Sequence, residues 1–221
     1  MTWAMGVLRC LKIELVIIGQ PHFPGPLMLV ANHTSWLDIT ALHASLFSRF
    51  IAKDELRRWP LIGFMAAQSG TFFLERNSRR DALRTVHRIA KSLQNGEVVA
   101  VFPEGTTSDG SALLPFHGNL LQAAISVNAP VQPVCIQYFD ARSGLRSETP
   151  NYVGDVHFLV SLWSILCAEN LSVWVQFGTP QWASGRTRRA WAKDLQAGVG
   201  DMQRQRPKGL PQSPQHAGGG T

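Results

Sequence analysis

Residues 32–38 read Asn-His-Thr-Ser-Trp-Leu-Asp and directly follow the apolar run Leu27–Ala31. A second junction of this kind lies further along the chain, where Val98–Phe102 gives way to Pro-Glu-Gly-Thr-Thr-Ser at residues 103–108. A short apolar run that ends in a polar loop is typical of a buried strand of an α/β protein, where site residues lie at strand ends. The two stretches therefore predict an α/β fold with a functional site between these loops.

Strand-like and helix-like segments alternate along the chain. This alternation predicts a single α/β domain over residues 1–204, with a central, mostly parallel or mixed sheet flanked by helices. Residues 205–221 are rich in Pro, Gln and Gly and are expected to form a disordered tail. The predicted strands are Lys12–Ile18, Leu27–Ala31, Arg49–Lys53, Thr71–Leu74, Val98–Phe102, Val131–Tyr138 and Leu171–Phe177. The clearest predicted helices are the segment capped by Ser78, in which Leu83, Val86, Ile89, Ala90 and Leu93 recur, and the segments Asn119–Val127, Phe158–Ala168 and Arg186–Met202.

Composition indicates a globular protein with an unusual surface. Of 221 residues, 45% are hydrophobic and only 16% are charged, and a lipid-facing surface would explain this low charge. The net charge of +6 favours anionic partners such as phospholipid headgroups, coenzyme phosphates or nucleic acid. Cys10, Cys135 and Cys167 lack any metal-like spacing and are predicted to be buried free thiols in a reducing compartment. Prolines interrupt the long uncharged stretches, so any membrane contact is expected to be peripheral.

His33 and Asp38 have the residue types of a general base and its orienting carboxylate. On one ideal helix, five positions would turn the two side chains about 140° apart. The pair forms if His33 lies in the loop before a helix and Asp38 lies in its first turn. A carboxylate on one imidazole nitrogen leaves the other nitrogen free to take a proton. The alternative is purely structural, because Ser35 and Asp38 also fit a capping box at the start of that helix.

Four ordered motifs give the chain a resemblance to the glycerolipid acyltransferase family, the enzymes similar to lysophosphatidic acid acyltransferase. The first motif is Asn-His-x4-Asp at residues 32–38, and the third is Phe-Pro-Glu-Gly-Thr at residues 102–106. The second is matched by Gly70–Arg76 and the fourth by Val131–Val134. The resemblance runs from about residue 27 to about residue 178 and implies a fold like that of glycerol-3-phosphate acyltransferase.

What the resemblance implies is an enzyme of membrane lipid biosynthesis. Such an enzyme moves a fatty acyl group from acyl-CoA or acyl carrier protein to the hydroxyl of a lysolipid, with His33 as base and Asp38 as its partner. It needs no cofactor, and no metal is expected because His33 has no second histidine or cysteine at a ligand spacing. The expected partner is a membrane lipid surface, and the expected location is the cytoplasmic face of a membrane.

Acceptor binding is implied for Arg76, Glu104, Gly105 and Thr106, with Thr107 beside them. Arg76 would hold a phosphate, because a guanidinium fork can engage it in two places. Thr107 stands where many phosphatidic-acid-forming members have the arginine of Glu-Gly-Thr-Arg. Glu-Gly-Thr-Thr resembles members that acylate other lysolipids, including lyso-ornithine lipid. The acceptor therefore stays open between the lysophosphatidic acid and lyso-ornithine lipid types.

Other features allow more than one interpretation. The stripe formed by Arg80, Arg84 and Arg88 could meet anionic headgroups or be a solvated helix face. The apolar segment Phe158–Ala168 is expected to bury in the core rather than touch a bilayer. The competing function is a non-catalytic lipid- or acyl-chain-binding module, which predicts a damaged site, whereas the base and its carboxylate are both present. A nucleic-acid partner is not expected, because exposed aromatic residues do not interleave with the basic ones.

Overall fold

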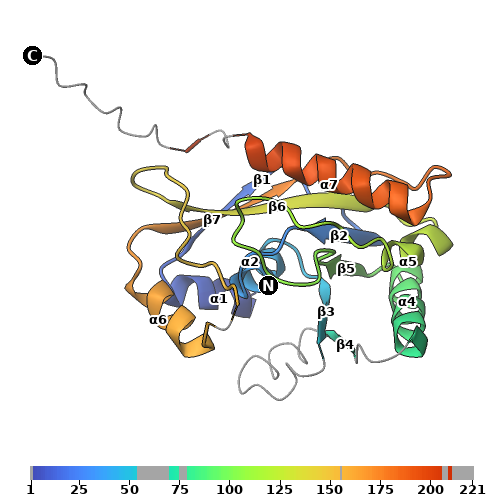
Figure 1. Ribbon diagram of the computed structural model, residues 1–221, viewed down its shortest axis with the longest axis horizontal. Helices are drawn as coiled ribbons and strands as arrows, with labels where there is room; N and C mark the ends of the chain where they lie inside the picture. Colours follow the sequence, from blue (N-terminus) through green and yellow to red (C-terminus); the bar gives the residue numbers. More distant parts are fainter. Residues whose placement is uncertain (1, 54–69, 75–78, 155, 206–208, 211–221) are drawn as a thin grey trace, which may run out of the picture.

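The chain forms one mixed sheet with helices on both faces. The computed structural model describes residues 2–53, 70–74, 79–154, 156–205 and 209–210. In that part of the chain the strands follow the order β1-β7-β6-β2-β5-β3-β4 (Figure 1). Neighbouring strands are parallel except β6 and β7, which are antiparallel. The strands are β1 Glu14–Ile18, β2 Leu27–Ala31, β3 Arg49–Lys53, β4 Phe72–Leu74, β5 Val98–Val101, β6 Val131–Asp140 and β7 Leu171–Phe177.

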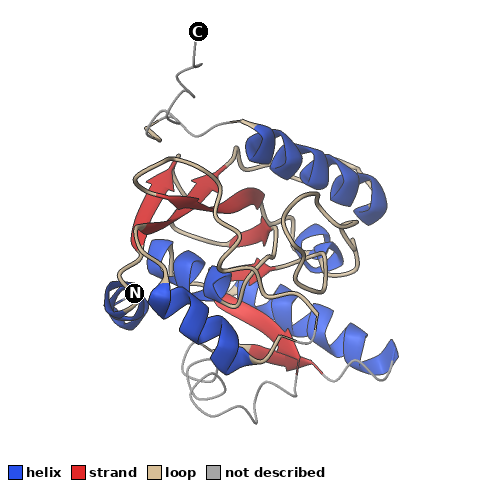
Figure 2. Ribbon diagram, turned by 60° about the vertical axis from the view of Figure 1, so that its left-hand side comes forward, coloured by secondary structure: helices blue, strands red, loops and turns tan. Residues whose placement is uncertain are grey.

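Strand β2 lies near the middle of the sheet and is buried along its whole length. Successive side chains of a strand point to opposite faces, so a central strand of this kind reads as a continuous apolar run. Leu27 and Leu29 enter one hydrophobic core, and Met28 and Val30 enter the other. Helices therefore cover both faces, as Figure 2 shows. The helices are α1 Thr2–Cys10, α2 Leu37–Ser45, α4 Arg79–Gln94, α5 Leu121–Ser126, α6 Phe158–Cys167 and α7 Arg188–Arg204.

The helices divide between the two cores. Residues of α1, α2 and α6 contribute to the core on one face, and residues of α4, α5 and α7 contribute to the core on the other. The predicted α/β class with a mixed, helix-flanked sheet is confirmed. Helix α1 has no counterpart among the predicted elements. Most of the predicted tail, residues 206–208 and 211–221, lies outside the described residues.

Helix α4 packs on the predicted face, with one exception. Ile89 and Leu93 lie in the core, and Val86 and Ala90 pack against it. Leu83 is exposed over 65% of its surface, although the apolar repeat assigned it to the buried side. The buried positions are Thr85, Ile89, Ser92 and Leu93. Leu83 precedes Ile89 by six positions, which places it about 120° round the helix from that residue. The buried side thus includes two small polar residues, Thr85 and Ser92, beside the apolar repeat.

Helix α6 is the largest departure from expectation, because most of its apolar surface is not in the core. Among its ten residues, only Ser161 and Ile165 are buried. Leu159, Val160, Trp163 and Leu166 are exposed, by 51% to 68% of their surface. The helix is apolar on all sides, so its sequence carried no signal for which face turns inward.

The cysteines are free, but the prediction that all three are buried is wrong. Cys135 is buried on β6, and burial raises the pKa of its thiol to about 12. Cys10 and Cys167 are exposed. Both lie in the last turn of short helices, α1 and α6, on faces turned away from the sheet.

Candidate active site

The loop after β2 is joined to strand β6 by the side chain of Asn32. Strand β2 pairs with β6 as far as Ala31, opposite Val134. One residue further, Asn32 Nδ2 donates to the carbonyl oxygen of Ile136 at 2.9 Å, and its Oδ1 accepts from the Ile136 amide at 2.7 Å. The side-chain amide thus continues the ladder after the backbone has turned away. This double hydrogen bond fixes where the next residue, His33, leaves the sheet.

His33 and Asp38 form the predicted pair. The distance from His33 Nδ1 to Asp38 Oδ2 is 2.9 Å. Because a carboxylate only accepts, Nδ1 carries the proton and Nε2 keeps its lone pair. The His33 side chain is 17% exposed and that of Asp38 is 0% exposed. A substrate can therefore reach the imidazole but not the carboxylate that orients it.

Asp38 receives four hydrogen bonds in the interior of the protein. Besides His33, the backbone amides of Thr34 and Ser35 donate to Oδ2, at 2.7 and 2.9 Å. The hydroxyl of Tyr138 donates to Oδ1 at 2.7 Å. A buried carboxylate is costly unless donors surround it, and this one has donors on both oxygens. Its orientation is consequently fixed from the loop and from strand β6 at once.

Tyr138 is a site residue that the sequence analysis did not identify. It lies on β6, one hundred positions from Asp38, and is 3% exposed. Burial and the nearby Asp38 charge raise the pKa of Tyr138 well above its usual range, so the phenol keeps its proton and remains a donor. The tyrosine lies near the end of a buried strand, and no local motif distinguishes it from a core residue.

The capping alternative and the base-orienting role of Asp38 are both present. Asp38 reaches back to the Ser35 amide, as a capping box requires. Ser35 Oγ in turn accepts from the Leu37 amide at 3.2 Å. The helix itself begins one residue later than predicted, with Trp36 at its N-cap position and no side-chain hydrogen bond from that cap. One carboxylate therefore starts helix α2 and orients the imidazole.

The Phe102–Ser108 loop lies against His33, as the sequence predicted. Glu104 Oε1 accepts from the His33 amide at 2.7 Å, and Oε2 accepts from the Leu114 amide at 2.9 Å. The Ser108 amide donates to the His33 carbonyl oxygen at 2.9 Å. Burial raises the pKa of Glu104, while these amides and the neighbouring histidine act in the opposite direction. Glu104 thus bridges two backbone segments, and its acceptor-binding role stays a prediction.

The other predicted acceptor-binding residues differ in how they are placed. Gly105 has a φ of +74°, a left-handed conformation that glycine adopts at little cost, and its amide donates to the Phe102 carbonyl oxygen at 3.1 Å. Thr106 is exposed. The Thr107 hydroxyl donates to the Tyr152 carbonyl oxygen. Arg76 lies outside the described residues, so its role also remains a prediction.

An aromatic ring supports the imidazole. The rings of His33 and Phe102 are stacked, with centroids 4.0 Å apart and planes 14° apart. Phe102 also stacks on the buried ring of Phe50, with centroids 6.1 Å apart. The stack fixes the plane of the imidazole ring, and the hydrogen bond to Asp38 fixes how the ring is turned within that plane. It therefore approaches a substrate with one defined nitrogen.

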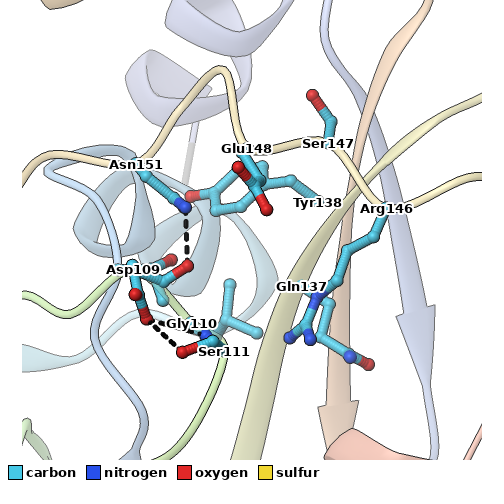
Figure 3. A pocket seen from close by; sticks show the side chains of 11 residues that line it. Asp109, Gly110, Ser111, Gln137, Tyr138, Arg146, Ser147, Glu148 and Asn151 are labelled. Atoms are coloured by element: carbon cyan, nitrogen blue, oxygen red, sulfur yellow. Dashed lines mark hydrogen bonds between the residues drawn. The ribbon is translucent and has the colours of Figure 1, made fainter.

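A polar hollow opens beside this network. Figure 3 shows residues that line it, among them Asp109, Arg146 and Glu148 from the loops after β5 and β6. Thr34 and Tyr138, which both donate to Asp38, also line the hollow. The two loops are joined where Asn151 Nδ2 donates to the Asp109 carbonyl oxygen. Charged groups of both signs can therefore meet a ligand next to the His33 loop.

The arrangement suits acid–base chemistry carried by one imidazole. In the described part of the chain, no cluster of histidine, cysteine, aspartate or glutamate could hold a metal ion. An imidazole with one nitrogen on a buried carboxylate and the other free is a competent general base for a hydroxyl. Activating a hydroxyl in this way prepares it to attack an electrophilic carbonyl.

Comparison with known proteins agrees with the fold and the motifs. A family model described as Acyltransferase matches residues 15–137. The 1-acyl-sn-glycerol-3-phosphate acyltransferase of Neisseria meningitidis is 42% identical over 174 residues, which cover 78% of this chain and 67% of that protein. The lyso-ornithine lipid O-acyltransferase of Pseudomonas aeruginosa is 36% identical over 197 residues, covering 89% and 75%. The crystal structure of the 1-acyl-sn-glycerophosphate acyltransferase PlsC of Thermotoga maritima matches the fold with a TM-score of 0.62 at 21% identity, covering 92% of this chain and 78% of that one.

Proposed function

The chain belongs to the acyltransferase family and is an enzyme, and from that premise we propose that it transfers a fatty acyl group from a thioester to the hydroxyl of a lysolipid at a membrane surface. The observation that carries the proposal is the oriented His33 imidazole, which holds its proton on the side of Asp38. Relatives that are named for lysolipid acylation support the choice of acceptor.

The reaction begins at the free nitrogen of His33. As the acceptor hydroxyl attacks the thioester carbonyl carbon, Nε2 takes its proton and the imidazolium is stabilised by Asp38. The tetrahedral intermediate then collapses, the carbon–sulfur bond breaks, and the proton returns from Nε2 to the departing thiolate. The products are an ester and a free thiol, and the histidine ends in its starting state. An oriented base of this kind contributes about 10² to 10⁴ in rate.

The acceptor is proposed to lie against the Glu104–Thr107 loop, with Arg76 holding a phosphate where the acceptor carries one. Thr107, whose hydroxyl donates to the Tyr152 carbonyl oxygen, stands where many phosphatidic-acid-forming enzymes have a cation. Lysophosphatidic acid and lyso-ornithine lipid are both candidates, since curated relatives are named for each. The donor is proposed to be acyl-CoA or acyl carrier protein, with no further cofactor.

Membrane association, at the cytoplasmic face, is part of the same proposal. A lysolipid resides in a lipid layer, and the net charge of +6 favours an anionic surface. In the described part of the chain, no helix is long and apolar enough to cross a bilayer. Contact is proposed to be peripheral because prolines interrupt the long uncharged stretches of the sequence.

A panel of donors and acceptors tests this function. Radiolabelled acyl-CoA and acyl carrier protein are each offered with lysophosphatidic acid, lyso-ornithine lipid and lysophosphatidylcholine, using the wild type and His33→Ala in mild detergent. We expect labelled product from the wild type and a loss of at least about 10²-fold in the variant, with unchanged thermal unfolding. Tight lipid binding without product in any combination would favour the non-catalytic binding module instead.

A further inference from the structure

Helix α6 presents an apolar face to the outside of the protein. Leu159, Trp163 and Leu166 recur at intervals of four and three residues, so they share one side of the helix, and Val160 lies next to them. Their exposed fractions are 62%, 68%, 51% and 58%. A contiguous exposed patch of this kind commonly marks a contact surface.

The patch lies in a stretch without charge. No lysine, arginine, aspartate or glutamate occurs from Val156 through Ala168, although the chain as a whole carries a net charge of +6. The two residues that turn inward, Ser161 and Ile165, are one turn apart on the opposite side. The helix thus has one narrow side in the protein and a broad apolar side away from it.

Helix α6 is joined directly to the loop that carries the base. Trp36, which lies between Ser35 and Leu37 in that loop, donates from Nε1 to Ser161 Oγ at 3.1 Å. Its ring meets that of Phe158 edge to face, with centroids 5.2 Å apart. In Figure 1, α6 lies at the outer side of the layer that it forms with α1 and α2. Helix α6 therefore rests on the His33 loop by its inward side, and its exposed face lies one helix diameter further out.

We propose that the exposed face of α6 is the surface by which the enzyme docks on a lipid layer, so that its acceptor reaches His33 from that layer. The proposal rests on the proposed function, because it takes the acceptor to be a membrane lipid. At ten residues, the helix is about 15 Å long, half the thickness of a hydrocarbon core, and lies flat in the interface. Trp163 at its middle has the amphipathic ring that favours this depth.

Because the exposed face of α6 is uncharged, vesicle binding through it should not depend on salt concentration. Binding through α6 depends on burial of apolar side chains, which salt does not screen, whereas attraction of the basic chain to anionic lipid weakens as salt rises. We expect the protein to float with vesicles of neutral phosphatidylcholine and to remain bound at high salt. Binding that needs anionic phosphatidylglycerol and is lost on adding salt would overturn the proposal.

Two variants, one on α6 and one away from it, test whether vesicle binding depends on this helix. The double variant Leu159→Gln, Trp163→Gln should reduce the fraction floated with neutral vesicles by at least about tenfold. Trp182→Gln removes another exposed tryptophan, which lies between β7 and α7, and should float like the wild type. Equal flotation of all three proteins would contradict docking through α6. So would a wild-type dimer, seen by sedimentation without lipid, that the double variant abolishes.

Activity with two forms of the acceptor separates this inference from the proposed function. With a short-chain lysolipid dissolved as monomer, the double variant should equal the wild type, and with a long-chain lysolipid in vesicles it should be at least about tenfold slower. Equal loss with both forms would show a damaged site and overturn docking. If the wild type acylates neither form, the proposed function fails, while the flotation result still decides the role of α6.

Discussion

Helix α2 carries two buried ionisable side chains, Asp38 and His43, whose surroundings are opposite in kind. Asp38 is fully buried and receives four hydrogen bonds. His43 is 1% exposed, and neither of its ring nitrogens has a hydrogen-bond partner in the described part of the chain, although the Ser48 backbone lies nearby. Its neighbours are the rings of Trp3, Phe47 and Phe50, at 4.9 to 6.1 Å.

The difference indicates that Asp38 serves the chemistry of the site and that His43 serves only packing. Four donors around a carboxylate fix its position to within hydrogen-bonding tolerance, which is what an orienting group requires. An imidazole among aromatic rings is held only by packing, and burial lowers the pKa of His43 so that it stays neutral. Changes at Asp38 should therefore alter chemistry, and changes at His43 should alter stability alone.

Asp38→Asn gives the largest expected effect on this comparison. Asparagine can present only one acceptor oxygen, so its amide nitrogen would face at least one of the four donors. We expect the transfer rate to fall by about 10²-fold or more and the free energy of unfolding to fall by about 1–3 kcal/mol. The checks are kcat and thermal unfolding, with exposed Asp194→Asn as the control. A loss of stability with unchanged kcat would reduce Asp38 to a helix cap.

Tyr138→Phe tests the contact from β6. The variant removes one donor from Asp38 and keeps the ring, so we expect kcat to fall by about five- to tenfold. A carboxylate with one donor fewer holds the imidazolium more strongly, so the acid limb of the pH–rate profile should move to higher pH. Tyr152→Phe is the matched control, because Tyr152 contacts Thr34 through its backbone amide. An unmoved profile in Tyr138→Phe would assign the tyrosine to packing.

His43→Leu has the smallest expected effect on activity, and it separates stability from chemistry. Removing two unpaired ring nitrogens should raise the free energy of unfolding by about 1 kcal/mol and leave kcat unchanged. Since the folded pKa of His43 lies below its ordinary value of 6.5, the wild type loses stability as pH falls below 6.5, where only the unfolded chain takes the proton. In urea titrations below pH 6.5, the free energy of unfolding should fall less for the variant than for the wild type. His87→Leu, at an exposed position of α4, should leave the pH dependence as it is.

Much of this architecture could be predicted from the sequence because local chemistry determines it. The bounds of β2, β3 and β7 are those predicted, and β2 and β7 are buried apolar runs that end at turn residues. The meeting of His33 with the Glu104 loop followed from two strand ends in a parallel sheet. Tyr138 could not be predicted, because its role depends on strand β6 extending past the end of β2, a tertiary feature.

The outward face of helix α6 was also beyond the sequence. Helix α6 is apolar all round, so its composition was equally compatible with burial and exposure. In α4, by contrast, the apolar repeat identified the inward side, and only Leu83 was assigned to it wrongly.

The most direct test of the central claim, that Asp38 acts through His33, is a double-mutant cycle on acyl transfer. Single-turnover rates are measured with radiolabelled donor for His33→Ala, Asp38→Asn and the double variant, in detergent with the preferred lysolipid. If the carboxylate serves only to orient the base, the double variant will be as slow as His33→Ala alone. A further loss in the double variant, equal to the full factor of Asp38→Asn, would contradict the account and give the two residues independent roles.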